Sequence, residues 1–119
     1  MSARRQKRMK IAFFEIKGWE KKIIRSALSR HKVLFFSEPL SEENVAEVRD
    51  ADVISVFIYS KLTKSLLGKL RAVKVIATRS TGFDHIDLGE CKRRGVSVYN
   101  VPSYGENTVA EHTFALILA

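Results

Sequence analysis

The stretch VISVFIY at residues 53–59 decides the fold that this sequence predicts. Six of its seven side chains are apolar or aromatic, and four of them are β-branched. A strand with one face in water alternates apolar and polar side chains, whereas an unbroken apolar run is typical of a strand covered on both faces. We therefore expect residues 53–59 to form a central strand of a parallel sheet.

Outward from this stretch, other short apolar runs alternate with helical patterns along the whole chain. The other expected strands are residues 10–15, 32–36, 73–78 and 97–101. The expected helices are residues 19–30, two short helices capped by Ser41 and Thr63, and a last helix from Asn107 to Ala119. Before that last helix, another is capped by Asp87 and runs through Arg94, with Gly95 after it as a left-handed C′ residue. Five such units with short connections predict an α/β fold of flavodoxin-like type, with a five-stranded parallel sheet in the order 2-1-3-4-5 and helices on both faces.

The length and the cysteine content restrict the class of protein. With 119 residues there is room for one domain, and the single cysteine, Cys91, excludes a disulfide framework and a cysteine-rich zinc site. No apolar run approaches the ~20 residues that a bilayer requires, and no signal-peptide pattern opens the chain. We expect a cytoplasmic protein with no metal site and no membrane partner.

The net charge of +8 at pH 7 is concentrated at the start of the chain. Five basic side chains and no acidic one lie within the first ten residues, so the other 109 residues carry a net charge of only +3. We expect residues 1–8 to be a disordered basic leader. A nucleic-acid-binding arm is the alternative, although the rest of the domain has no excess of basic side chains that would follow a phosphate backbone.

Ligands of parallel sheets bind beyond the carboxyl ends of the strands, near the point where the strand order switches. The loop after residues 10–15 lacks the Ser/Thr/Gly cradle of a flavin phosphate site. Tyr59 and Ser60 stand where a response-regulator receiver needs its phospho-acceptor aspartate, and no GxGxxG follows any expected strand. These absences exclude three common uses of the fold.

The loop at residues 79–87, with the sequence RSTGFDHID, offers more specific chemistry. Consecutive backbone N–H groups in its Ser-Thr-Gly turn suit a small anion such as a carboxylate, and Gly82 permits close approach of a ligand. Arg79 either adds positive charge there or is a solvated side chain. The alternative interpretation is a tight turn in which Asp84 and Asp87 act as caps.

The loop at residues 102–107 places the hydroxyl of Tyr104 at the mouth of the same crevice. This side chain either closes over a substrate or packs on the last helix. His112 adjoins Glu111, but neighbouring helical positions face different directions, so the two do not form a catalytic pair. We expect His31 and His85 to be exposed loop residues and Cys91 to be a small buried apolar group.

Three segments in this order, residues 78–87, 101–104 and 107–113, resemble the NAD-dependent D-2-hydroxyacid dehydrogenase family, and its D-lactate dehydrogenase branch most of all. The resemblance extends over nearly the whole chain from Met9. Members of that family have a flavodoxin-like substrate lobe and an inserted Rossmann lobe. The resemblance implies that residues 9–103 are part of the substrate lobe, that residues 104–119 are an interlobe helix, and that the chain ends before the NAD lobe.

The resemblance also implies roles for particular residues. The backbone N–H groups of Thr81 and Gly82 would hold the carboxylate of a small 2-keto or 2-hydroxy acid, and Phe57 and Tyr59 would flank the substrate pocket. The remaining two predicted site residues would contact the cofactor: Tyr104 would lie against substrate and nicotinamide, and Val109 would touch the nicotinamide side. NAD would be the cofactor of the full enzyme, with none expected on this chain alone.

The sequence departs from the family pattern in three respects: it lacks the GxGxxG fingerprint, the catalytic arginine and the Glu–His pair. His112 matches the interlobe helix and is not that catalytic histidine. We therefore expect a truncated substrate lobe that is inactive by itself. The apolar residues 114–119 predict a homodimer or helix exchange through the segment from Asn107 to Ala119. The alternatives are a non-enzymatic protein-interaction or oligomerisation module, a small-anion sensor, and nucleic-acid binding through the leader.

Overall fold

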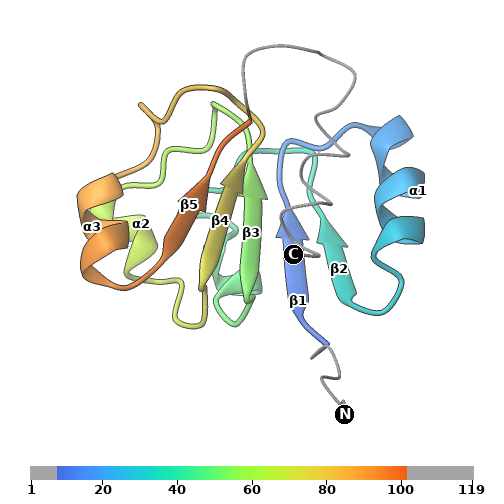
Figure 1. Cartoon of the computed structure of the whole chain (residues 1–119), viewed down its shortest axis with the longest axis horizontal. Helices are drawn as coiled ribbons and strands as arrows, with labels where there is room; N and C mark the ends of the chain where they lie inside the picture. Colours follow the sequence, from blue (N-terminus) through green and yellow to red (C-terminus); the bar gives the residue numbers. More distant parts are fainter. Residues whose placement is uncertain (1–7, 102–119) are drawn as a thin grey trace.

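A computed structural model of the chain describes residues 8–101 and shows a five-stranded sheet in the order β2-β1-β3-β4-β5, with all neighbouring strands parallel. The strands are β1 (Lys10–Phe13), β2 (Lys32–Phe35), β3 (Val53–Val56), β4 (Val75–Thr78) and β5 (Ser97–Tyr99). They run in one direction, so their carboxyl ends share one edge of the sheet (Figure 1). The predicted fold class and strand order are confirmed, and each strand is one to three residues shorter than expected.

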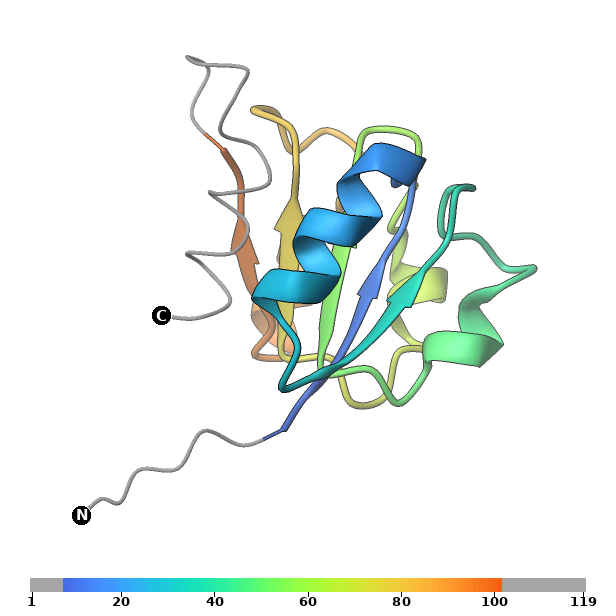
Figure 2. The same ribbon diagram turned by 90° about the vertical axis from the view of Figure 1, so that its right-hand side faces the viewer.

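The helical segments cover both faces of the sheet. Helix α1 (Gly18–Ala27) lies on one face, and the 3₁₀ helix η1 (Val45–Val48), α2 (Lys64–Leu67) and α3 (Leu88–Arg93) lie on the other (Figure 2). Alternate residues along β1 and the position directly after it enter two different cores: Ile11 and Phe13 pack with α1, whereas Ala12 and Phe14 join the larger core on the opposite face. All four residues of β3 are buried, as its nearly all-apolar sequence predicts.

Local capping explains where α2 and α3 begin. The Thr63 hydroxyl accepts a hydrogen bond from the Leu66 N–H at 3.2 Å, and the Asp87 carboxylate accepts one from the Glu90 N–H at 2.9 Å. Gly95 adopts the predicted left-handed conformation, with φ of 74°. Both predicted caps and the predicted end of α3 are therefore confirmed.

The segment after Ser41 is less helical than expected. The Ser41 hydroxyl accepts a hydrogen bond from the Glu43 N–H at 3.2 Å, and the Asn44 side-chain oxygen accepts one from the Ser41 N–H at 2.9 Å. These side chains stabilise a turn in place of a first helical turn. Only one short 3₁₀ helix follows, and it does not have Ser41 as its cap.

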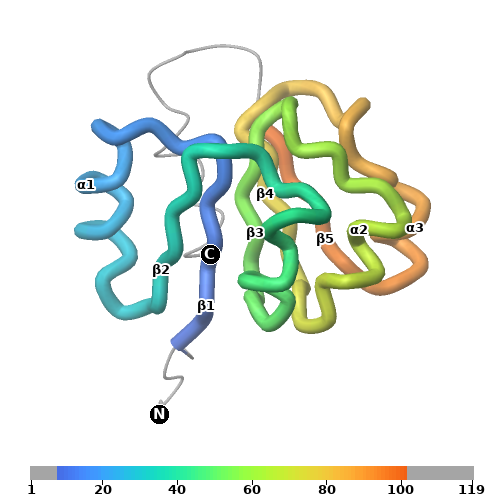
Figure 3. The backbone as a smooth tube through the Cα atoms, turned by 180° about the vertical axis from the view of Figure 1, so that it is seen from behind, coloured from blue at the N-terminus to red at the C-terminus, as the bar shows by residue number. Residues whose placement is uncertain are grey.

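The course of the chain reverses at β1. From β1 the chain passes through α1 to β2 on one side, whereas β3 and every later strand lie on the other side. The segments that leave β1 and β3 consequently diverge towards opposite faces (Figure 3). In an open parallel sheet this switch point, at the carboxyl ends, is where ligands bind.

Some predictions lie outside the described residues. These concern Tyr104, Val109, the segment from Asn107 to Ala119, and most of the basic leader. Within residues 8–101 there is no helix with the length and the apolarity needed to cross a membrane. In the same part of the chain, no three His, Cys, Asp or Glu side chains come together as a metal site would require.

Candidate functional site

A pocket of about 750 Å³ lies at the switch point, between the segments that follow β1, β2 and β3. We call it the switch-point pocket; it is lined by Glu15, Ile16, Lys17, Gly18, Ser37, Pro39, Phe57 and Tyr59. The rings of Phe57 and Tyr59 meet edge to face, with centroids 6.3 Å apart. Two of the residues predicted to flank a substrate pocket thus form one wall of an actual pocket.

Glu15 holds this wall in place, a role that was not predicted from the sequence. One carboxylate oxygen accepts hydrogen bonds from the Phe57 N–H at 3.0 Å and the Ser60 hydroxyl at 2.5 Å. The other accepts one from the Tyr59 N–H at 3.1 Å. All three donors follow β3, so the segment after that strand is bonded to the end of β1.

The backbone of Glu15 is strained. Its φ is 59°, and it is the only residue other than glycine with a positive φ among residues 8–101. A left-handed conformation costs a residue with a side chain roughly 1–2 kcal/mol. Each hydrogen bond to a charged group contributes about 1.5–3 kcal/mol, so the three bonds of the carboxylate offset that strain.

Arg79 is buried rather than solvated, which corrects one of the two interpretations of this residue. Its side chain donates hydrogen bonds to the Ser55 hydroxyl at 2.8 Å and to the carbonyl oxygens of Phe14 and Glu15 at 2.6 and 2.9 Å. Burial lowers the pKa of Arg79, against the opposing effect of the nearby carboxylates. The guanidinium therefore joins the carboxyl ends of β1, β3 and β4, and three of its five N–H donors already have partners within the domain.

The turn at Thr81 and Gly82 leaves N–H groups available. The Asn100 side-chain amide donates to the Thr81 carbonyl at 2.7 Å, and the Ser80 hydroxyl donates to the Gly82 carbonyl at 3.0 Å. No acceptor for the backbone N–H of Thr81 or Gly82 lies within residues 8–101. Because a trans peptide directs its C=O and N–H to opposite sides, the bond to Asn100 aims the Gly82 N–H away from Asn100.

Packing within the domain does not require a glycine at position 82. A Cβ atom at Gly82 would meet no other atom of residues 8–101 within 4 Å, and the φ of Gly82 is not left-handed. Thr81 and Gly82 are both exposed. Within residues 8–101, no atom therefore occupies the space next to this peptide.

His85 and His31 are buried, so the expectation of two exposed histidines is wrong. Their exposed fractions are 8% and 7%, because each bonds back to the sheet rather than extending from its loop. His31 Nδ1 accepts a hydrogen bond from the Met9 N–H at 3.0 Å. His85 Nε2 lies 2.9 Å from the Thr78 hydroxyl, which lies 2.6 Å from the Ser80 hydroxyl.

The hydrogen bonds from His85 through Thr78 and Ser80 to the Gly82 carbonyl allow only one assignment of the hydroxyl protons. Since Ser80 donates its proton to the Gly82 carbonyl, Thr78 must donate to Ser80, and His85 Nε2 must then donate to Thr78. Burial lowers the pKa of His85. A neutral imidazole with its proton on Nε2 thus stabilises the turn through two hydroxyl groups.

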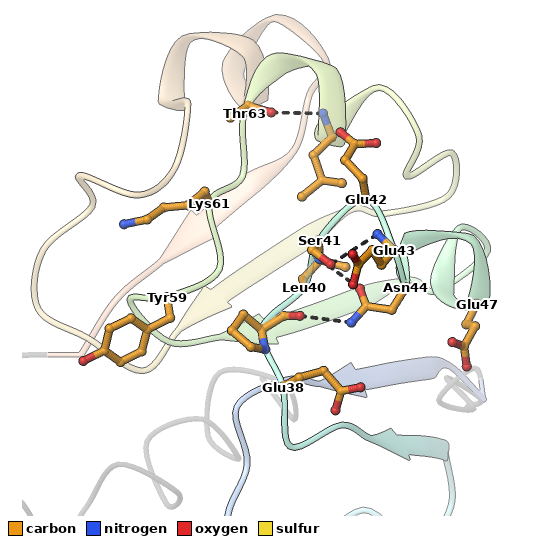
Figure 4. Close-up of a pocket in the computed structure, with 12 residues that line it drawn as sticks. Glu38, Leu40, Ser41, Glu42, Glu43, Asn44, Glu47, Tyr59, Lys61 and Thr63 are labelled. Atoms are coloured by element: carbon orange, nitrogen blue, oxygen red, sulfur yellow. Dashed lines mark hydrogen bonds between the residues drawn. The ribbon is translucent and has the colours of Figure 1, made fainter.

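A second pocket, of about 720 Å³, lies between residues 38–47 and the segment from Tyr59 to Thr63. Its lining includes four glutamates: Glu38, Glu42, Glu43 and Glu47. They lie on one side of the pocket, and Tyr59 and Lys61 lie on the other (Figure 4). Four carboxylates repel an anion, so this pocket is a poor site for a carboxylate ligand compared with the turn at Thr81 and Gly82.

Comparison with known proteins agrees with the resemblance found in the sequence. Residues 11–115 match the family described as D-isomer specific 2-hydroxyacid dehydrogenase, catalytic domain. This chain belongs to that family. Its relatives include a 2-hydroxyacid dehydrogenase homolog of Haemophilus influenzae, at 32% identity over 92% of this chain and 34% of the relative. A D-lactate dehydrogenase of Staphylococcus aureus is similar to the same extent.

Solved structures of the family have the same fold. The D-lactate dehydrogenase of Aquifex aeolicus complexed with NAD and lactic acid superposes with a TM-score of 0.75 and 41% identity, over 91% of this chain and 32% of that one. The D-lactate dehydrogenase of Escherichia coli gives a TM-score of 0.74 at 28% identity, over 92% of this chain and 36% of that one. The chain thus spans about a third of the length of these 2-hydroxyacid dehydrogenases.

The structure brings together only part of the predicted site of a 2-hydroxyacid dehydrogenase. Phe57 and Tyr59 line the switch-point pocket, while Thr81 and Gly82 form a separate turn after the neighbouring strand β4. Reasoning from the sequence missed Glu15 and the bonds of the buried Arg79. Only the position of Glu15, at the end of the first expected strand (residues 10–15), was a signal that could have identified it.

Proposed function

We propose that this domain binds the substrate of an NAD-dependent D-2-hydroxyacid dehydrogenase, and that the substrate is a small 2-keto or 2-hydroxy acid such as pyruvate or D-lactate. The observation that carries the proposal is the turn at Thr81 and Gly82. Both of its carbonyls are bonded to the domain, and both of its N–H groups lack an acceptor within residues 8–101.

The turn suits a carboxylate for electrostatic reasons. Hydrogen bonds from N–H groups to an ionised carboxylate are about twice as strong as bonds between neutral partners. Consecutive amides in a fixed turn supply them with little loss of conformational entropy on binding. With no side chain on Gly82, the carboxylate can approach the backbone, and the remainder of the substrate would then extend towards Phe57 and Tyr59.

NAD supplies the hydride acceptor in this proposal, but the residues of this chain do not fit its phosphates. The sequence contains no GxGxxG, and the D-lactate dehydrogenase complexed with NAD is about three times as long as the matched segment. Hydride transfer requires reacting atoms held roughly 3–3.5 Å apart and a group that moves the proton. We therefore assign only substrate binding and orientation to this domain, and we expect no dehydrogenase activity from the 119-residue chain alone.

Further parts of the proposal concern the segment after residue 101. Tyr104 would lie against substrate and nicotinamide, and Val109 would contact the nicotinamide side. Residues 9–103 would be the substrate lobe, with residues 104–119 as the interlobe helix. The segment from Asn107 to Ala119 would mediate a homodimer or helix exchange, for which light scattering at micromolar concentration is the test.

A ligand titration followed by NMR tests the proposal. Pyruvate added to the ¹⁵N-labelled chain should produce saturable shifts centred on the Thr81 and Gly82 amides. Pyruvamide, which has the same shape without the negative charge, should leave these signals in place. Absence of saturable shifts, or equal shifts with both compounds, would contradict a carboxylate site at this turn.

A further inference from the structure

Four loops at the carboxyl edge of the sheet converge on Glu15. Its carboxylate binds the backbone N–H groups of Phe57 and Tyr59 after β3. It also accepts the proton of the Ser60 hydroxyl, which in turn accepts a hydrogen bond from the Leu40 N–H after β2 at 2.9 Å. Arg79, directly after β4, donates to the carbonyl of Glu15 itself.

We propose that Glu15 is a positioning residue that sets which substrate side chain fits the switch-point pocket. This inference rests on the proposed function, in which the substrate carboxylate binds at Thr81 and Gly82. With the carboxylate fixed there, the location of the opposite wall decides how large a side chain can be accommodated.

The geometry of the wall supports this role. The Glu15 carboxylate accepts hydrogen bonds from the N–H groups of Phe57 and Tyr59, two residues whose side chains both line the pocket. The intervening Ile58 does not line the pocket and is 38% exposed. The bonds from Glu15 therefore fix the backbone at the two positions that carry the pocket wall.

Arg79 connects this wall to the carboxylate-binding turn. It precedes Ser80 in the chain, it is itself buried, and its guanidinium holds the backbone carbonyls of Phe14 and Glu15. The anchor of the wall is consequently fixed relative to the start of the turn. The path from turn to wall passes through two side chains, Arg79 and Glu15.

The conformation of Glu15 argues against a purely local role for this side chain. At φ of 59° a glycine would be free of strain, whereas glutamate is strained. The backbone at this position alone would therefore favour glycine. The hydrogen bonds to the segment after β3 explain why a long carboxylate side chain occupies it.

The test compares the affinities of the full chain for two 2-keto acids, pyruvate and the bulkier 2-oxoisocaproate, by NMR titration. We expect Glu15→Gly and Glu15→Gln to change the ratio of the two dissociation constants by about threefold to tenfold. Pyruvate binding itself should change less than about twofold, because its methyl group makes little contact with the wall. Glu47→Gln removes a carboxylate from the second pocket and should leave the ratio unchanged.

Glu15→Gly also separates positioning from folding, since glycine accepts the left-handed backbone without strain. It should give a folded protein with a larger change in the ratio than Glu15→Gln, because glutamine retains one oxygen that can accept from the wall. The amide signals of Phe57 and Tyr59 should move in both variants, even without ligand.

Two outcomes overturn different statements. If the unsubstituted chain binds neither keto acid, the proposed function fails, and the specificity role fails with it. If the unsubstituted chain binds both at Thr81 and Gly82 but the ratio is unchanged in Glu15→Gly, the proposed function stands and the inference about Glu15 is wrong.

Discussion

The turn at Thr81 and Gly82 and the wall of the switch-point pocket are held in place in different ways. The bonds that hold the turn come mostly from nearby residues, since Thr78, Ser80 and His85 lie within seven residues of one another. The wall is held by Glu15, whose partners lie 42 to 45 residues further along the chain. Binding chemistry can therefore be encoded within one loop, whereas the shape of a pocket depends on contacts between loops.

Arg79→Met offers the strongest test of the connection between the two regions. The substitution leaves the carbonyls of Phe14 and Glu15 and the Ser55 hydroxyl without their buried donor. At about 1–3 kcal/mol for each unsatisfied buried group, we expect the free energy of unfolding to fall by about 3 kcal/mol or more. Urea denaturation followed by circular dichroism measures this change.

Lys69→Met is the control, because within residues 8–101 the Lys69 ammonium bonds only to Glu42, and both side chains are more than half exposed. This substitution should lower the free energy of unfolding by less than about 1 kcal/mol. Equal destabilisation by the two substitutions would show that the buried guanidinium does not join the two regions.

Gly82→Ala should have the next largest effect, on ligand binding rather than on folding. The added methyl group meets no atom of residues 8–101 within 4 Å, but it would occupy the space through which the proposed carboxylate reaches the turn. Loss of one charge-assisted hydrogen bond, at about 1.5–3 kcal/mol, corresponds to a roughly tenfold to hundredfold weaker affinity for pyruvate. Isothermal titration calorimetry, with thermal unfolding as the check on stability, measures both quantities.

Gly89→Ala provides the comparison for this experiment. A Cβ atom there makes an ordinary contact of 3.6 Å with the Asp87 side chain, within α3 and away from the turn. Pyruvate affinity should be unaffected. Full affinity in Gly82→Ala would contradict close approach of the ligand to the backbone.

Thr78→Val weakens the hydrogen bonds that hold the turn at Thr81 and Gly82 and leaves the residues of the pocket wall unchanged. Valine keeps the shape of threonine but removes the hydroxyl between His85 and Ser80. We expect a loss of about 1 kcal/mol in the free energy of unfolding, and a twofold to threefold loss of pyruvate affinity at most, since Ser80 can still bond to Gly82. The Phe57 and Tyr59 amide signals should not move, because Arg79 and not Thr78 connects the turn to the wall, and their displacement would show that Thr78 also helps to hold the wall.

The sequence was sufficient for the features that depend on neighbouring residues. Nearly continuous apolar runs identified β3 and the parallel sheet, and Thr63, Asp87 and Gly95 marked the ends of helices correctly. The Ser-Thr-Gly turn was recognisable because its N–H groups belong to consecutive residues.

The features that the sequence did not predict are those whose partners are distant along the chain. Arg79 bonds to the carbonyl of Phe14, 65 residues away, and Glu15 bonds to Phe57, 42 residues away. Charged and imidazole side chains are exposed in most proteins, so a sequence pattern favours exposure until the fold supplies a buried partner. The same reason accounts for the wrong expectation about His31 and His85.

The smallest expected effect is the dependence of stability on pH that the two buried histidines produce. Burial lowers the pKa of His85, and burial together with the charges of Arg30 and Arg8 lowers the pKa of His31, both from a value of 6.5. As the pH falls through 6.5, the unfolded chain takes up protons before the folded domain does, so the free energy of unfolding must decrease. The decrease ends where the folded histidines become protonated.

Urea denaturation at pH values from 7.5 to about 5 measures this decrease in the free energy of unfolding, and His85→Asn should reduce it. If the stability stays constant, or rises on acidification, the histidines are not held neutral, and the proton order from His85 through Thr78 to Ser80 loses its basis.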